Sequence, residues 1–332
     1  MFVSYAKSWF PNWVRKRRNG RDPYPIELKV LGVLRVLAKG STFDQIYELN
    51  NISAETNRIF FHSFCAKAVE VLGPTWISIP RTDDELSPIL TMYAKNGFPG
   101  CVGSIDCVHI RWDNCPAKWR NMYRGKGAHP TISYEVTVSH DKTILFATIG
   151  HYGTRNDKTI VRFDGFVSAI HECGLYAEKT FNLYQCDGVE KEYKGYYLMC
   201  DGGYHRWRCL QCGYSQPLGE SDSNYTSHIG SVRKDVECTF GILKIRFRIL
   251  RSPIIYKKKV QIDNVFKFCC ILHNILKAND TTEGNVEDYG YDSEPEQLER
   301  TVGNRRTAED VTAVDHSYMQ KDLSNGTAVF GT

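Results

Sequence analysis

The chain has 332 residues, of which 42% are apolar and 24% charged, the composition of a globular protein with one large domain or two ordinary ones. No apolar run approaches the ~20 residues that a membrane helix requires, and residues 1–21 lack the apolar core of a signal peptide. Twelve cysteines are spread along the chain without such a signal, so we expect reduced thiols in an intracellular protein rather than a disulfide framework.

The net charge of +4 conceals an asymmetry between the body and the end of the chain. Residues 281–332 hold eleven acidic and four basic side chains, so the preceding 280 residues hold 27 acidic and 38 basic ones. A basic body favours a polyanionic partner such as nucleic acid, although a solvated surface would account for the same charges. Because residues 281–332 lack apolar periodicity, we expect them to form a disordered acidic tail.

The N-terminal region, residues 1–98, is predicted to be an all-helical domain. Its apolar residues recur at helical spacing, Gly40 is typical of a helix stop, Ser53 is typical of a helix cap, and Gly73-Pro74 should end the helix that Ser53 begins. We predict helices over residues 27–38, 42–49 and 53–72 and a fourth between Thr82 and Gly97.

Two features of this region are typical of nucleic-acid binding, and each has an ordinary alternative. The run Arg15-Lys16-Arg17-Arg18, followed by Arg21, fits a nuclear import signal or a DNA-binding arm, or else a solvated basic stretch. The short and long helices on either side of residue 51 have helix-turn-helix spacing, which an ordinary helical hairpin shares. The side chains expected to point outward from the longer helix are Asn57, Arg58, His62 and Lys67.

The pattern changes near Gly100, and residues 99–280 predict an α/β domain. Three segments are rich in β-branched and aromatic residues, and the apolar run Tyr196–Cys200 is typical of a strand buried on both faces. We predict strands at Gly103–Trp112, Thr131–Ser139, Ile144–Gly150 and Tyr196–Cys200, and helices at Val161–Cys173, Val232–Arg246 and Val260–Asn279.

Acidic residues interrupt three of these otherwise apolar elements. Asp106 lies inside the first strand, and Asp201 directly follows Tyr196–Cys200, where a carboxylate faces the cleft at the end of a sheet. Glu237 is expected on the buried side of its helix, because Phe240 and Gly241 lie three and four residues further on, whereas Asp235 should face solvent.

Three inward-facing carboxylates would repel one another and lose solvation unless a cation accompanied them. Mg²⁺ and Mn²⁺ prefer such oxygen ligands. Two such ions ~3.5–4 Å apart clamp the phosphate in phosphodiester displacement. Each acid taken singly has an ordinary reading as a turn former or a salt-bridged helix residue, so the prediction rests on all three sharing one basic domain.

Basic residues are dense around Glu237, with nine Lys or Arg side chains between residues 233 and 259. Aromatic residues interleave with them, which suits a track along a phosphate backbone, although a solvated helix face accounts for some. The residues assigned to DNA binding are Arg233, Lys234, Lys244, Arg246 and Arg248.

Two weaker signals concern metal-binding side chains. Cys209-x-x-Cys212, with Cys200 and His205 nearby, would suit zinc, but a single pair without a second matched pair is a weak signal. His109 and His273 lie among apolar residues, which favours hydrogen-bonded core or supporting roles over metal ligation.

Together these motifs resemble the PIF/Harbinger transposases, in the branch of plant transposon proteins. The resemblance covers about Gly97 to Asn279, and the order and spacing of the motifs agree as well as their letters. The motifs are Gly103-Ser-Ile-Asp106-Cys-x-His109, Gly153-Thr-x-Asn156-Asp157, Tyr196-Tyr-Leu-x-x-Asp201-Gly, Val232-Arg-Lys-Asp-Val-Glu237-x-x-Phe-Gly241-x-Leu-x-x-Arg246-Phe and Ile271-Leu-His273-Asn274.

The resemblance implies a ribonuclease H-like fold, a mixed sheet with helices on both faces. It implies a catalytic, metal-binding triad of Asp106, Asp201 and Glu237, with Asp157 and His109 in supporting roles. It also implies two Mg²⁺ or Mn²⁺ ions, double-stranded DNA as the substrate, a Myb-like partner protein and a nuclear location, and it leaves the oligomeric state open. We therefore predict a DDE endonuclease or transposase. The alternatives are a domesticated, catalytically silent DNA-binding protein and a zinc-binding regulator.

Overall fold

The computed structural model describes residues 1–14, 22–125, 127, 129–184 and 188–282. The basic run at residues 15–18, Arg21, and residues 283–332 of the predicted acidic tail lie outside the described residues, while its first two residues, 281 and 282, end the helix α11 (Lys259–Thr282). None of the described helices is long and apolar enough to cross a membrane.

Five α-helices precede the first strand among the described residues; four of them match the predicted helices, and α1 was not predicted. Capping explains most of their boundaries: Gly40 adopts a left-handed conformation (φ 66°) after α2, and Thr42 forms a capping box with Gln45 at the start of α3. The helices are α1 (Phe2–Trp9), α2 (Ile26–Lys39), α3 (Phe43–Asn50), α4 (Ala54–Trp76) and α5 (Asp83–Lys95).

The longest of these helices differs from its prediction at one end. Helix α4 continues through Gly73-Pro74 to Trp76 instead of stopping there. Pro74 has no backbone N–H, so the helix lacks the hydrogen bond that would reach the carbonyl of Glu70. Because Glu70 is exposed, this loss does not end the helix. The amide of Asn274 on α11 (Lys259–Thr282) donates to the carbonyl of Trp76 over 2.6 Å and holds the added turn.

At the turn between α3 and α4, one of the side chains predicted to face outward points into the protein instead. Asn57, predicted to point outward, is buried, and its amide donates to the carbonyl of Ile52 (2.6 Å) and to Asn50 (3.3 Å). Arg58 pairs with Glu55 over 2.6 Å, and His62 is half-buried against Tyr256. The expectation that these side chains face DNA is wrong for Asn57, because it closes the turn.

The central sheet is mixed, with strand order β3-β2-β1-β7-β8 and β4 paired to β2. Strands β1, β2 and β3 are antiparallel neighbours, while β7 and β8 run parallel to β1. The strands are β1 (Cys101–Arg111), β2 (Thr131–Val138), β3 (Ile144–Ala147), β4 (His151–Tyr152), β7 (Tyr197–Met199) and β8 (Leu210–Gln211).

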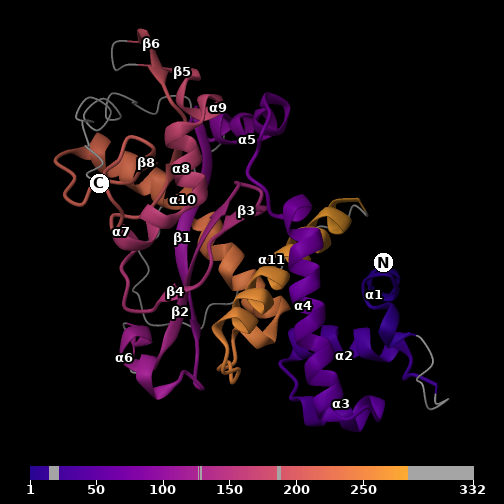
Figure 1. Ribbon diagram of the computed structural model, residues 1–332. Helices are drawn as coiled ribbons and strands as arrows, with labels where there is room; N and C mark the ends of the chain where they lie inside the picture. The colour runs from indigo at the N-terminus through magenta and orange to yellow at the C-terminus, as the bar shows by residue number, and fades with distance from the viewer. Residues whose placement is uncertain (15–21, 126, 128, 185–187, 283–332) are drawn as a thin grey trace, which may run out of the picture.

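A separate hairpin of β5 (Thr180–Tyr184) and β6 (Glu190–Lys194) lies at the opposite end of the structure from α2 and α3 (Figure 1). This hairpin was not predicted. Four of the five residues of β6 are charged, and most side chains of both strands are exposed, so they lack the apolar signal of the central strands.

Helices cover both faces of the sheet. Helix α11 lies between the sheet and α4 (Figure 1), and its side chains share one hydrophobic cluster with α1–α4 and with α10 (Glu220–Arg246). On the other face, α5 and α8 (Gly165–Glu172) form a second cluster with β7 and β8. Short helices at α6 (Arg120–Tyr123), α7 (Asp157–Ile160) and α9 (Gly174–Ala177) join these elements. The protein is therefore mixed α/β with a mixed sheet, while the division into domains stays a prediction.

Candidate active site

Of the predicted carboxylates, Asp106 lies on β1, and Asp201 lies two residues after the end of the neighbouring parallel strand β7. Ser104 on β1 is in register with Met199 on β7. Asp106 follows Ser104 by two residues, and Asp201 follows Met199 by two residues. Each carboxylate is oriented by a backbone amide: Asp106 Oδ1 accepts from the N–H of Cys107, and Asp201 Oδ1 accepts from the N–H of Gly203, both over 2.7 Å. The parallel pairing of β1 and β7 thus brings together residues from distant parts of the chain.

The third carboxylate reaches the same place from α10, through an arginine. Arg233 lies one helical turn before Glu237, and its Nη2 donates to Glu237 Oε1 over 2.6 Å. Its Nη1 donates to Asp106 Oδ2 over 3.2 Å. A guanidinium group therefore bridges the strand and the helix that carry two of the predicted acids.

The charges at this site are those of a carboxylate cluster partly removed from water. The pKa of Asp106 is raised to about 6, chiefly by burial; the hydrogen bond from the Cys107 amide and the charge of Arg233 lower it, and the charges of Asp201 and Glu237 add smaller upward contributions. The pKa of Arg233 is raised because its three carboxylate neighbours outweigh the effect of burial. The negative charge of the three carboxylates favours a cation beside them, and in this structure that cation is the guanidinium of Arg233.

Asp157 approaches the site from the other face of the sheet. It is the first residue of α7, where Asn156 caps the helix by accepting from the N–H of Thr159 over 2.9 Å. A side chain on Gly203 would lie 2.9 Å from Asp201 Oδ1 and 3.3 Å from Asp157 Oδ2, so both carboxyl groups flank this bare glycine. The charge of Asp157 also contributes to the raised pKa of Cys107, after the larger effect of burial.

His109 lies on the other side of β1 from Asp106. Its Nδ1 is 3.0 Å from Thr131 Oγ1 on β2. Alternation along β1 places it on the face of Cys107, opposite to Asp106. Its supporting role stays a prediction.

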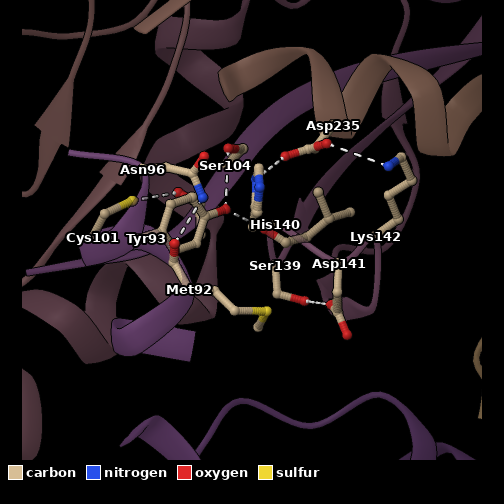
Figure 2. Close-up of polar contacts among 12 residues, drawn as sticks. Met92, Tyr93, Asn96, Cys101, Ser104, Ser139, His140, Asp141, Lys142 and Asp235 are labelled. Atoms are coloured by element: carbon tan, nitrogen blue, oxygen red, sulfur yellow. Dashed lines mark hydrogen bonds and ion pairs between the residues drawn. The ribbon is translucent and has the colours of Figure 1, made fainter. Parts of the chain in front are cut away.

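The predicted orientations of the two acids on α10 are reversed. The side chain of Asp235 is 13% exposed, whereas that of Glu237 is 48% exposed. Asp235 Oδ2 lies 2.6 Å from His140 Nδ1 and its Oδ1 lies 3.5 Å from Lys142 Nζ, in the turn between β2 and β3 (Figure 2). The physical reason is that α10 packs against this turn as well as against the sheet, so its Asp235 side is covered too.

The basic residues assigned to DNA binding do not share one surface. Arg233 is directed into the acid cluster, and Arg246 pairs with Asp280 on α11 over 3.0 Å. Lys244 is half-buried two turns beyond Glu237 on the same side of α10, and burial lowers its pKa. Lys234 and Arg248 are exposed. The sequence analysis noted the density of charge but missed that Arg233 is part of the acid site, although its spacing from Glu237 could have shown it.

Within the described ranges, no group of three or more His, Cys, Asp or Glu side chains is spaced to hold a metal ion as it stands. At Cys209 and Cys212 the thiols are buried in the core, and burial raises the pKa of Cys209 to about 11. At the acid cluster the oxygen donors suit a hard cation, but Arg233 lies between Asp106 and Glu237 and contacts both. The oxygen donors are therefore of the kind that a divalent ion prefers, and in this structure a guanidinium contacts two of the three acids.

A family model described as plant transposon protein matches residues 76–284, which is more than half of the chain. The matched segment contains Asp106, Asp157, Asp201, Arg233 and Glu237. No curated protein and no solved structure matched the chain.

Proposed function

The chain belongs to the plant transposon protein family, and from that premise we propose that it is a DDE endonuclease of the PIF/Harbinger type that cuts double-stranded DNA. One observation carries the proposal. The carboxylates of Asp106 on β1, Asp201 just after β7 and Glu237 on α10 lie close enough to one guanidinium, that of Arg233, for each of their charges to raise its pKa. Acids drawn together from distant segments around one cation are what a metal-dependent nuclease needs.

The proposed fold is ribonuclease H-like, as the sequence motifs suggest. Its support is the mixed sheet, in which β1 pairs antiparallel with β2 on one side and parallel with β7 on the other, with helices on both faces. This arrangement puts Asp106 near the centre of the sheet and leaves Asp201 at the end of β7, where a ligand has access.

The proposed metal ligands are Asp106, Asp201 and Glu237. The chemistry that two bound Mg²⁺ or Mn²⁺ ions supply is activation of water or a 3′-hydroxyl and neutralisation of charge on the leaving oxygen. Asp106 and Asp201 are held in place by backbone amides, so they are preorganised. Glu237, whose side chain is 48% exposed, completes the set by moving away from Arg233.

The decisive experiment is nicking of supercoiled plasmid with and without Mn²⁺, together with DNA binding measured in EDTA. Wild-type protein should nick only with metal, while Glu237→Gln and Asp106→Ala should bind DNA without nicking it. Glu48→Gln, an exposed change on α3, is the matched control and should behave as wild type. Metal-dependent nicking that survives in Glu237→Gln would overturn the assignment of the triad.

A second candidate function is DNA binding by a catalytically silent descendant of such an enzyme. It is favoured by one observation: Arg233 already pairs with Asp106 and Glu237, so these two acids have a cationic partner without any metal. In that case the wild-type protein binds DNA in a salt-dependent manner. It shows no nicking on cognate element ends, even with a Myb-like partner protein present.

Nuclear location, a Myb-like partner and self-association belong to the same proposal. Each is testable apart from catalysis, by localisation of the tagged full-length chain and by co-purification. The zinc-binding alternative would require stoichiometric zinc in the purified protein, measurable by elemental analysis.

A further inference from the structure

A group of basic and aromatic side chains follows Asp157 and Asp201 along the chain. We define the α7 rim as Lys158, Arg162, His205 and Trp207. Lys158 directly follows Asp157 on α7, and Arg162 lies one turn further in the 3-10 segment Val161–Phe163. His205 and Trp207 lie in the loop that begins at Asp201. Both segments of the rim therefore start from a carboxylate that flanks Gly203.

Contacts within the rim hold its members in a fixed arrangement. The Nε–H of Arg162 donates to Nε2 of His205 over 3.3 Å, and the ring of His205 stacks on the indole of Trp207 at 4.8 Å with an interplanar angle of 13°. The pKa of His205 is lowered by burial first and then by the charges of Arg162 and Lys158. A neutral His205 accepts from Arg162 and orients its guanidinium without cancelling its charge.

The positive charges of the rim are available to a ligand. Lys158 and Arg162 are both exposed, and among the described residues neither makes an ion pair. Arg162 and Trp207 also line a shallow hollow whose one acidic member is Glu172. By contrast, Arg233 and Arg246 from the denser run on α10 are both paired.

We propose that the α7 rim binds the phosphate backbone of the DNA strand whose phosphodiester lies at the acid cluster. The inference rests on the proposed function and adds to it the surface that sets the position of the strand. A strand carries one phosphate per about 3.4 Å of helix axis, so phosphates next to the one at Asp201 fall where the rim begins.

Electrostatics favours such a surface at this place, above all when no metal is bound. A polyanion approaching three carboxylates is repelled unless cations beside them reverse the local potential. The exposed guanidinium and ammonium groups of Arg162 and Lys158 supply that charge, and they contact phosphate without reading bases. The rim should therefore contribute affinity and register but no sequence preference.

The test compares two double variants that remove the same charge. The rim variant is Lys158→Ala with Arg162→Ala, and the matched control is Arg35→Ala with Lys39→Ala, an exposed arginine and lysine at the same spacing on α2. Binding of a fluorescent duplex of about 30 base pairs and mixed sequence is measured in EDTA over a range of salt concentrations.

The rim variant should bind at least about tenfold more weakly, and its slope of log affinity against log salt should fall by about two, since each lost phosphate contact lowers it by about 0.9. The control should change affinity less than about threefold. Equal losses in both variants, or a larger loss in the control, would overturn the proposal. Unchanged thermal midpoints verify that both variants fold, as expected for exposed side chains.

A third variant, Arg162→Lys, separates oriented contact from charge alone. It keeps the charge but loses the planar group that His205 orients, so it should recover only part of the affinity. Plasmid nicking is scored separately. Failure of nicking by wild type, with loss of binding in the rim variant, would reject the nuclease and keep the rim; nicking by wild type, with unchanged binding in the rim variant, would do the reverse.

Discussion

Arg233 and Glu237 lie one turn apart on α10 and are joined by a contact of 2.6 Å between Nη2 and Oε1, in a place where the carboxylates would otherwise face only one another. The same guanidinium reaches Asp106 over 3.2 Å. Arg233 thus acts as an internal counter-ion of the acid cluster, and a divalent cation at these acids has to compete with it.

Removing this counter-ion should make the protein depend on metal for stability. We expect Arg233→Gln to lower the free energy of unfolding in EDTA by about 1–3 kcal/mol, because it leaves like charges without a cation. The contact with Glu237 is discounted here because that side chain is 48% exposed. Thermal unfolding should show a larger rise on adding Mn²⁺ than in wild type. Lys234→Gln, the exposed neighbour, is the control, and an equal response in both variants would contradict the prediction.

Neutralising Asp106 should separate activity from stability. Burial and like charges raise the pKa of Asp106 to about 6, so the ionised carboxylate is held at a cost near neutral pH. Asp106→Asn should therefore abolish nicking while leaving the free energy of unfolding in EDTA equal to, or up to about 3 kcal/mol above, that of wild type. Urea unfolding at pH 7 measures this. A clear loss of stability would mean that the Arg233 contact matters more than the buried charge.

A buried carboxyl pair beneath the site should make stability depend on pH. Glu135 on β2 is fully buried, and burial, with the charge of Asp164 second, raises its pKa well above the usual value of 4.5. A carboxyl with a raised folded-state pKa binds its proton more tightly in the folded chain, so stability falls as the pH rises above 4.5. Glu135→Gln should flatten this fall between about pH 5 and pH 9.

The glutamine variant should also be more stable than wild type at the alkaline end of that range. Its amide can donate to Asp164 Oδ2, which lacks a hydrogen-bond partner among the described residues. Denaturant midpoints at several pH values provide the measurement, with Glu48→Gln as the exposed control. Parallel pH profiles for wild type and Glu135→Gln would show that Glu135 ionises normally.

Neutralising the two acids on α10 should have different effects: loss of stability for Asp235 and loss of nicking for Glu237. Asp235→Asn weakens the contacts with His140 and Lys142, so we expect a loss of about 1–3 kcal/mol, since the Asp235 side chain is 13% exposed. Glu237→Gln should change stability by less than about 1 kcal/mol and remove nicking instead. Chemical unfolding of both variants, beside plasmid nicking, compares them directly. Equal destabilisation would place Glu237 among the structural contacts.

The ends of several helices and the buried strand before Asp201 could be predicted because their sequence signals are local. Gly40, Ser53 and Thr82 mark helix ends through their own backbone and side-chain bonding, and the apolar run before Asp201 needs no distant partner to be recognised. The same local logic placed Asp106 and Asp201 at strands that the structure brings together.

The orientation of α10 was not accessible in this way. The buried stripe of α10 runs through Val232, Val236 and Leu243, with Asp235 on one border and Glu237 on the other. Which border is covered depends on the turn containing His140, which lies far away in the sequence. Helical periodicity finds the stripe but cannot choose between its borders, and for that reason the sequence analysis exchanged the roles of the two acids.

The parallel pairing of β1 with β7 also governs when the site can exist. Asp106 leaves the ribosome long before its neighbour Asp201, and Glu237 follows later still. Pairing between such distant segments is a slow, late step of folding, and chains emerge from the N-terminus onward. A nascent chain therefore carries no assembled acid cluster until α10 has been synthesised, so the three carboxylates come together only when most of the described chain has left the ribosome.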